Sequence, residues 1–174
     1  MDPAEPMTGL LQLYGAIGLA VVVLVAGVRI AIAVYRRKGL AALLAELDGE
    51  EVLRCEPAAH YFGQKSVAWP RPRGHGALVL TSRRLRFRLW SPPTELDIPV
   101  GAIVGLAAPL TARGGVKPQR ALYVIFGNKQ GEDDAATWLV SDPEAWTEEL
   151  AQVADGLAEV PQSVDVGWWE PPKP

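Results

Sequence analysis

A long stretch without charge near the N-terminus constrains this chain more than any other feature. From Thr8 to Val28 the sequence has 21 residues and no charged side chain, and eleven of them are Leu, Ile or Val. An α-helix rises about 1.5 Å per residue, so this stretch matches a hydrocarbon layer about 30 Å thick. At about −0.3 to −0.6 kcal/mol each, the eleven apolar side chains favour insertion by roughly −3 to −7 kcal/mol. The sequence therefore predicts a transmembrane helix over residues 9–35.

The residues around this stretch fit a membrane helix better than two alternatives, a buried core helix and a cleaved signal peptide. Arg29 lies near one end, where its long side chain can reach the interface, and Tyr14 and Tyr35 lie 21 positions apart, as interfacial aromatic residues do. A signal peptide begins with basic residues, whereas Asp2 and Glu5 precede this stretch. A core helix that is apolar all round needs a larger protein to bury it.

The charges that flank the helix predict its orientation. Arg36, Arg37 and Lys38 follow it, and no base precedes it. The positive-inside rule then places residues 1–8 outside an inner (cytoplasmic) membrane and residues 36–174 in the cytoplasm. A single cysteine suits that reducing compartment. We expect no disulfide within the chain, no metal site and no cofactor.

The rest of the chain changes from helical to strand-like spacing. In the basic linker 36–48, four leucines at positions 40, 43, 44 and 47 predict a short amphipathic helix, either separate or a continuation of the membrane helix broken at Gly39. Alternation then predicts short strands at 52–56, 61–68, 77–81, 85–89, 95–99, 103–107, 122–126 and 136–140, with a loop at 111–119. Asp142 before Pro143 predicts the start of a helix over 143–158.

The residues after this helix, 159–174, are rich in proline, and we expect them to be disordered. They contain the pair Trp168-Trp169, which is unusual in a solvated tail. This pair could dock on the domain, on a partner or at the lipid interface.

These elements predict an α+β (mainly β) fold, in which a small antiparallel barrel or sandwich at 49–158 is covered by a terminal helix. The segment Gly76–Phe87, GALVLTSRRLRF, resembles the hairpin motif G-x-L-x-L-T-x-x-R-L-x-F of bacterial pleckstrin-homology-like (PH-like) and GRAM-like domains. The stretch Leu96–Gly105 is similar to the family's x-I-P-L-x-x-I-x-x-V segment, and Gly49–Leu53 to its G-E-x-V-L start.

The resemblance implies a barrel of about seven strands with a C-terminal helix, and a binding or scaffolding role, often at membranes, without catalysis. Members that bind phosphoinositides carry bases between their first two strands. Here residues 57–66 offer only Lys65 and His60. A phosphoinositide site is therefore not expected.

The net charge of −3 conceals two opposite halves. Residues 54–93 carry eight bases and one acid, and residues 121–174 carry two bases and eleven acids. Three hypotheses remain open for the basic half: it meets the anionic inner leaflet, the acidic hairpin loop and terminal helix neutralise it, or it binds an acidic protein partner. The candidate binding residues are Arg71, Arg73, Arg83, Arg84, Arg86 and Arg88.

The sequence contains no motif typical of a catalytic site. His60 and His75 are isolated along the chain, and aromatic residues do not alternate with the bases as in nucleic-acid-binding surfaces. We therefore expect no enzyme and no nucleic-acid partner. The favoured function is a membrane-anchored binding or scaffold module that engages anionic lipid, a protein partner or a second copy. The alternatives are a structural subunit of a membrane complex and, less favoured, a small membrane-bound enzyme.

Overall fold

The computed structural model describes residues 5–154, except 48, 69, 112–118 and 129. The chain divides into two compact units, residues 1–38 and 39–174. Predictions for Trp168, Trp169 and the tail 159–174 lie outside the described residues. The elements, in chain order, are α1 (Glu5–Ala45), β1 (Val52–Gln64), β2 (Gly74–Thr81), β3 (Arg84–Leu89), β4 (Thr94–Pro99), the 3-10 turn η1 (Val100–Ala102), β5 (Ile103–Ala107), β6 (Leu110–Thr111), β7 (Gln119–Arg120), β8 (Leu122–Gly127), β9 (Asp133–Leu139) and α2 (Pro143–Val153).

Helix α1 contains the predicted membrane-spanning stretch. Within the described residues it is the one helix long and apolar enough to cross a membrane, with a mean hydropathy of 2.7 over the most apolar 18-residue window of Ile17–Ala45. Its most apolar window is not buried in the protein, and Leu19 and Leu24 are each 67% exposed. The structure therefore does not show a buried core helix. The predicted break at Gly39 is wrong, because α1 continues without interruption to Ala45.

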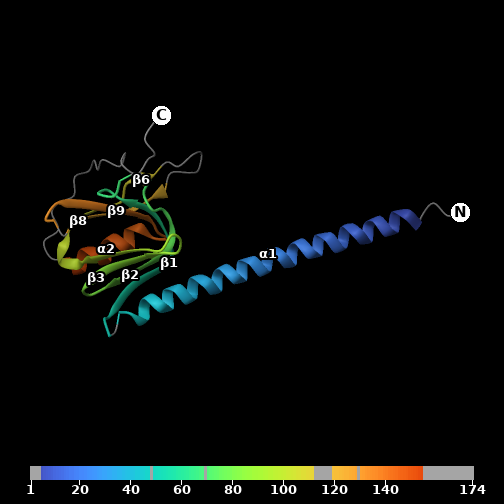
Figure 1. Cartoon of the computed structure of the whole chain (residues 1–174), viewed down its shortest axis with the longest axis horizontal. Helices are drawn as coiled ribbons and strands as arrows, with labels where there is room; N and C mark the ends of the chain where they lie inside the picture. Colours follow the sequence, from blue (N-terminus) through green and yellow to red (C-terminus); the bar gives the residue numbers. More distant parts are fainter. Residues whose placement is uncertain (1–4, 48, 69, 112–118, 129, 155–174) are drawn as a thin grey trace, which may run out of the picture. The chain divides into compact units, whose positions relative to one another are not determined.

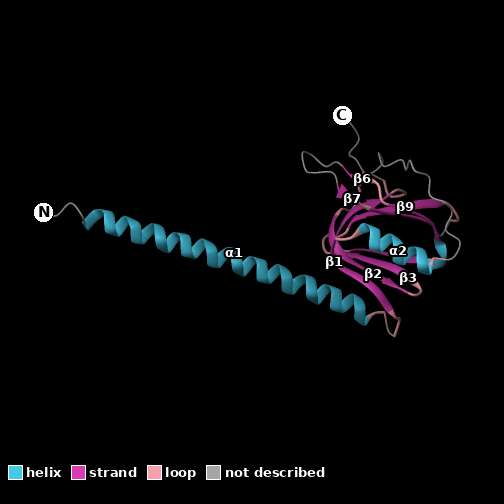
Figure 2. Cartoon of the chain, turned by 180° about the vertical axis from the view of Figure 1, so that it is seen from behind, coloured by secondary structure: helices cyan, strands magenta, loops and turns pink. Residues whose placement is uncertain are grey.

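The domain is built on one bent antiparallel sheet of seven strands in the order β4-β3-β2-β1-β9-β8-β5. Helix α2 lies within the curve of this sheet (Figures 1 and 2). The predicted mainly β architecture with a terminal helix is confirmed. A closed barrel is not seen, because β4 and β5 are the two edges of the sheet and are joined through η1.

Strand β1 corrects the prediction of two separate strands at 52–56 and 61–68. Its first part pairs with β2, whereas His60 and Tyr61 pair with both β2 and β9. Register shifts between Glu56 and Ala59 leave room for Pro57, which a regular ladder would exclude. One long strand can therefore bend and serve both halves of the sheet.

The interior is filled by alternate residues of the strands and by one face of α2. Phe87 and Trp138 are at most 1% exposed and pack with Tyr61, and Trp146 and Leu150 of α2 close over them. Asp142 caps α2 by accepting a hydrogen bond from the Ala145 N–H, as predicted. The helix ends at Val153, earlier than the predicted residue 158, and the Ala154 N–H donates to the Leu150 carbonyl.

One other prediction changes at the periphery. The predicted loop 111–119 contains the ends of a small two-stranded ribbon, β6 paired with β7. The residues between these two strands lie outside the described part of the chain.

Candidate functional site

The arginines of β3 lie together on the outer face of the sheet. Arg84, Arg86 and Arg88 alternate with Leu85, Phe87 and Leu89, which are each 1% exposed. This alternation follows from the two-residue period of a strand, because successive side chains point to opposite faces. The predicted arginine face therefore exists.

Each arginine of this face is already matched by carboxylates. Arg86 and Arg88 both contact Glu46, at 2.8 and 2.6 Å, and both contact Glu95, at 3.3 and 2.7 Å. Arg84 lies 3.0 Å from Glu50 and 3.0 Å from Asp97. The hydrogen bond from Arg88 lowers the pKa of Glu46, and the hydrogen bond to Asp97 raises the pKa of Arg84. Both shifts favour the charged forms.

These partners differ from the ones proposed from sequence. The acidic hairpin loop 127–134 makes no ion pair with the β3 arginines within the described residues; Glu46, Glu50, Glu95 and Asp97 do so instead. The terminal helix does pair with the basic half elsewhere, because Glu149 binds Arg54 at 2.7 Å. That hydrogen bond lowers the pKa of Glu149.

Glu46 is held over the arginine face by apolar packing at the end of α1. Leu43 and Leu47, 0% and 4% exposed, pack on Ala77 and Val79 of the outer face of β2. Gly39 lies directly against the Trp90 ring, and a Cβ atom there would overlap the ring. This close approach explains why a glycine occurs inside a continuous helix.

The other predicted bases are not part of the arginine face. Arg71 donates to the carbonyls of Val67 and Lys65 and so stabilises its own loop. Arg73 is half-buried in the same connection. Arg83, in the turn between β2 and β3, is exposed and has no ion pair within the described part of the chain.

The membrane-related residues all lie on α1. Their order along it follows the sequence: Tyr14, Arg29, Tyr35, Arg36, Arg37 and Lys38. Tyr14 and Tyr35 are 66% and 61% exposed. Their relation to a membrane stays a prediction.

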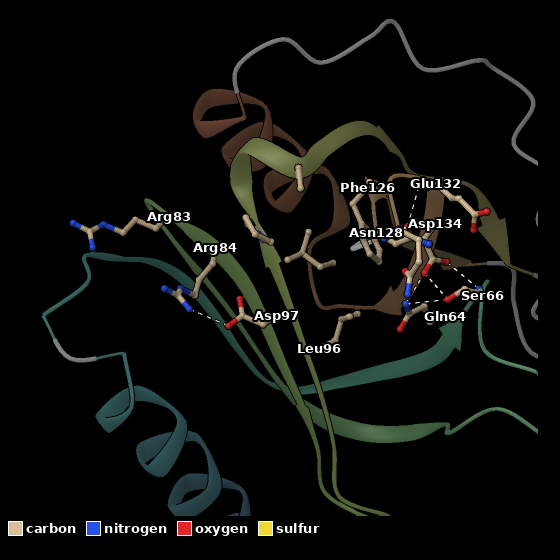
Figure 3. A pocket seen from close by; sticks show the side chains of 15 residues that line it. Gln64, Ser66, Arg83, Arg84, Leu96, Asp97, Phe126, Asn128, Glu132 and Asp134 are labelled. Carbon is tan, nitrogen blue, oxygen red and sulfur yellow. Dashed lines mark hydrogen bonds and ion pairs between the residues drawn. The ribbon is translucent and has the colours of Figure 1, made fainter.

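A hollow lies at the open edge of the sheet, where β4 has no strand neighbour on one side. This edge cavity has a volume of about 930 Å³. One wall is β4 from Leu96 to Pro99 with Arg83 and Arg84 at its end, and the other is the β8–β9 hairpin with Gln64 and Ser66 (Figure 3). Three apolar side chains, Leu96, Ile98 and Phe126, line it between the walls.

A buried carboxylate fixes the hairpin wall of the edge cavity. Asp134 is 1% exposed and accepts hydrogen bonds from Gln64 Nε2 at 2.5 Å and from Ser66 N and Oγ at 2.9 and 2.6 Å. Burial alone would raise the pKa of Asp134, but the hydrogen bonds from Gln64, Ser66 and the Ala135 N–H outweigh burial and lower it. Asp134 is therefore a structural anion whose acceptor capacity is already used.

Sequence reasoning missed Asp134, although a signal for it was present. Asp134 lies two and four positions before Ala136 and Trp138 on β9, so its side chain is on the same face of the strand, which faces the interior of the domain. Extending the strand alternation back by one pair would have placed this acid inside. The edge cavity itself leaves no such trace, because β4 and β8 come together only through the topology.

Sequence reasoning also treated His60 and His75 as isolated, and the structure corrects this. They are register partners on β1 and β2, with ring centres 4.8 Å apart. His60 also lines a smaller hollow of about 530 Å³ beside Glu56 and Ser141. Ser141 donates its N–H and Oγ–H to Glu56, at 3.0 and 2.5 Å. Among the described residues, no group of three or more His, Cys, Asp or Glu could hold a metal ion.

Comparison with known proteins finds no match for this chain. No protein-family model matches the sequence, and no curated protein matches it. The case for function therefore depends on the arginine face, the edge cavity and helix α1.

Proposed function

We propose that this chain is a single-pass membrane protein whose cytoplasmic domain, of the PH-like type that its motifs resemble, binds a protein segment in the edge cavity. The observation that carries the proposal is the open edge of β4, where an apolar floor meets Arg83. A concave site with an apolar floor and a few polar groups is the usual form of a binding site, and its volume suits one. The apolar, exposed helix α1 supplies the anchor.

The ion pairs of the arginine face favour a protein segment over a bare lipid surface. An anionic leaflet attracts bases that lack local partners, at about 1 kcal/mol for each. Arg84, Arg86 and Arg88 already have carboxylate partners, so a lipid headgroup would have to displace Glu46 and its neighbours. Contact of anionic lipid with Arg36, Arg37 and Lys38 remains compatible with the proposal, because it orients the helix and needs no site on the domain.

The single cysteine provides a direct test of the anchor and its orientation. Cys55 is exposed, so a maleimide reagent can reach it wherever the domain faces the reagent. We expect a membrane-impermeant maleimide to label Cys55 only after the inner membrane is permeabilised. In the matched control, Cys55→Ser combined with Thr8→Cys, labelling should occur before permeabilisation. The opposite pattern, or release of the chain from membranes by alkaline carbonate, would refute the membrane proposal.

Site-specific crosslinking in native membranes tests binding at the cavity. A photoreactive amino acid at Ala102, which lines the cavity, should capture a protein, and one at the exposed Val52 should not. Mass spectrometry then distinguishes another protein from a second copy of this chain. Equal capture at both positions, or none at Ala102, would contradict a binding role for the cavity.

A further inference from the structure

We infer that the edge cavity receives its partner as an added β-strand: an extended peptide segment pairs with the free side of β4, places apolar side chains on Ile98 and Phe126, and directs a carboxylate to Arg83. This inference rests on the proposed function and names the kind of partner for that same site. Main-chain pairing at an exposed edge is a general mode of peptide recognition.

The phase of the hydrogen-bond ladder shows which main-chain groups are available. The Val100 N–H donates to the Arg83 carbonyl, at 2.9 Å. Hydrogen-bonded pairs alternate along an antiparallel ladder, so Ile98 and Leu96 bond to β3 through their register partners Leu85 and Phe87. The N–H and C=O groups of Asp97 point the other way, towards the open side.

The same phase follows independently from the other side of β3. The Trp90 N–H donates to the His75 carbonyl, so residues 88 and 86 bond to β2. Residues 85, 87 and 89 are then left to bond to β4. Both bonds therefore leave the N–H and C=O of Asp97 without a partner in the strand ladder and direct them to the open side. Asp97 is exposed, so these groups are accessible for pairing with an added strand.

The side chains around this edge define the chemistry of the segment. Leu96 and Ile98 point inward from β4, and Phe126 lies opposite, so every second residue of an added strand would face an apolar floor. The carboxylates of Glu95 and Asp97 on the outer face are already paired with arginines, so they do not repel an acidic segment strongly. Arg83 is exposed beside the end of β4 and makes no ion pair with any described residue.

These features select a short, extended segment in which apolar residues alternate with polar ones and an acid lies near the Pro99 end. The edge also limits what can be added. Pro99 has no N–H to donate, so pairing cannot continue past it, and the charged side chains of β4 disfavour indiscriminate sheet association.

The test uses a phage-displayed library of random twelve-residue peptides, selected on the full chain in lipid nanodiscs against empty nanodiscs. We expect the selected peptides to alternate apolar and polar residues and to contain Asp or Glu. Their affinity is then measured on two matched variants. Asp97→Pro removes the outward N–H and should weaken binding about tenfold or more, whereas Asp97→Ala keeps the N–H and should change it by less than about threefold.

Arg83 provides a second pair of variants that does not depend on how Asp97→Pro folds. Arg83 is exposed, so Arg83→Glu should leave the fold intact while weakening the selected peptides about threefold to tenfold. Arg83→Lys should retain most of the affinity. Equal affinity in Asp97→Pro and Asp97→Ala, both shown to be folded by circular dichroism, would overturn strand addition, as would selected peptides indifferent to Arg83→Glu.

The outcomes separate this inference from the proposed function. If Ala102 captures a partner in membranes but that partner is insensitive to Asp97→Pro, the cavity binds by another mode and strand addition is wrong. If the library yields no peptide above empty nanodiscs, strand addition is also wrong. If Ala102 captures nothing in membranes, the proposed function fails, whatever the peptides show.

Discussion

The arginine face of β3 and the edge cavity beside β4 lie on neighbouring strands, yet they differ in what they leave unsatisfied. The arginine face has many charges, and all three of its guanidinium groups contact carboxylates of the same domain. The edge cavity has charges of both signs, but it includes Arg83, which makes no ion pair within the described residues, and a strand edge whose outward main-chain groups have no ladder partner. If the edge cavity is the binding site, as we propose, binding depends on unmet interactions rather than on the density of charge.

The largest loss of stability is expected from a substitution in the end of α1 that covers the arginine face. Leu43 is fully buried on β2, so Leu43→Ala should lower the free energy of unfolding by about 2–5 kcal/mol. Thermal unfolding of the full chain in detergent, followed by circular dichroism, measures this loss. The matched control is Ala42→Ser, an exposed position of the same turn, which should be neutral. An unchanged midpoint for Leu43→Ala would show that the helix end does not hold Glu46 over the arginines.

A smaller effect is expected on the cavity side, from Asp134→Asn. The new amide would present N–H groups to the donors of Gln64 and Ser66. This should lower the free energy of unfolding by about 1–3 kcal/mol near neutral pH. The folded state lowers the pKa of Asp134, so this carboxylate stabilises the protein above its unfolded pKa of about 3.9 and loses that contribution as pH falls below it.

The difference in the free energy of unfolding between the wild type and Asp134→Asn should therefore be constant above about pH 5 and shrink below about pH 4. Denaturant unfolding at several pH values measures it. Asp133→Asn, at the exposed neighbour, is the control and should give no comparable difference. A difference that grows as the solution is acidified would contradict the assignment of Asp134 as a stabilising anion.

The smallest changes in stability are expected from substituting Arg86, which has ion pairs, and Arg83, which has none within the described residues. Arg86→Ala should destabilise the domain by about 0.5–1 kcal/mol, because it removes contacts with Glu46 and Glu95. Arg83→Ala should change stability by less than about 0.5 kcal/mol. Added salt should reduce the first loss and leave the second unchanged, since only Arg86 has ion pairs to screen. Equal losses for both variants would show that the two arginines do not differ as described.

The sequence was sufficient for the elements that follow a regular period. The strand Ile103–Ala107 and the helix start at Asp142 agree with their predictions, because local alternation and capping decide them. The sequence was insufficient wherever a residue distant along the chain decides the local structure. Gly39 was expected to break a helix, and only the Trp90 ring against it explains its presence within one.

The candidate site shows the same division. Alternation identified the β3 arginines, but their carboxylate partners come from β4 and from the turn between α1 and β1, which no local pattern connects. His60 and His75 are fifteen positions apart in sequence and become neighbours only through strand register. The edge cavity is the extreme case, because it is defined by the side of β4 that has no neighbouring strand.

The position of β1 at the centre of the sheet has a consequence for the order in which the molecule is made. Strands β1 to β4 pair in chain order, so this meander can form as soon as residue 99 has left the ribosome. The other side of β1 must wait for β9, which ends at residue 139, a delay of about 2–8 s at 5–20 residues per second. During that interval the apolar inner face of β1 has no partner from β9. The edge cavity is also completed only after that interval, since its second wall arrives with the β8–β9 hairpin.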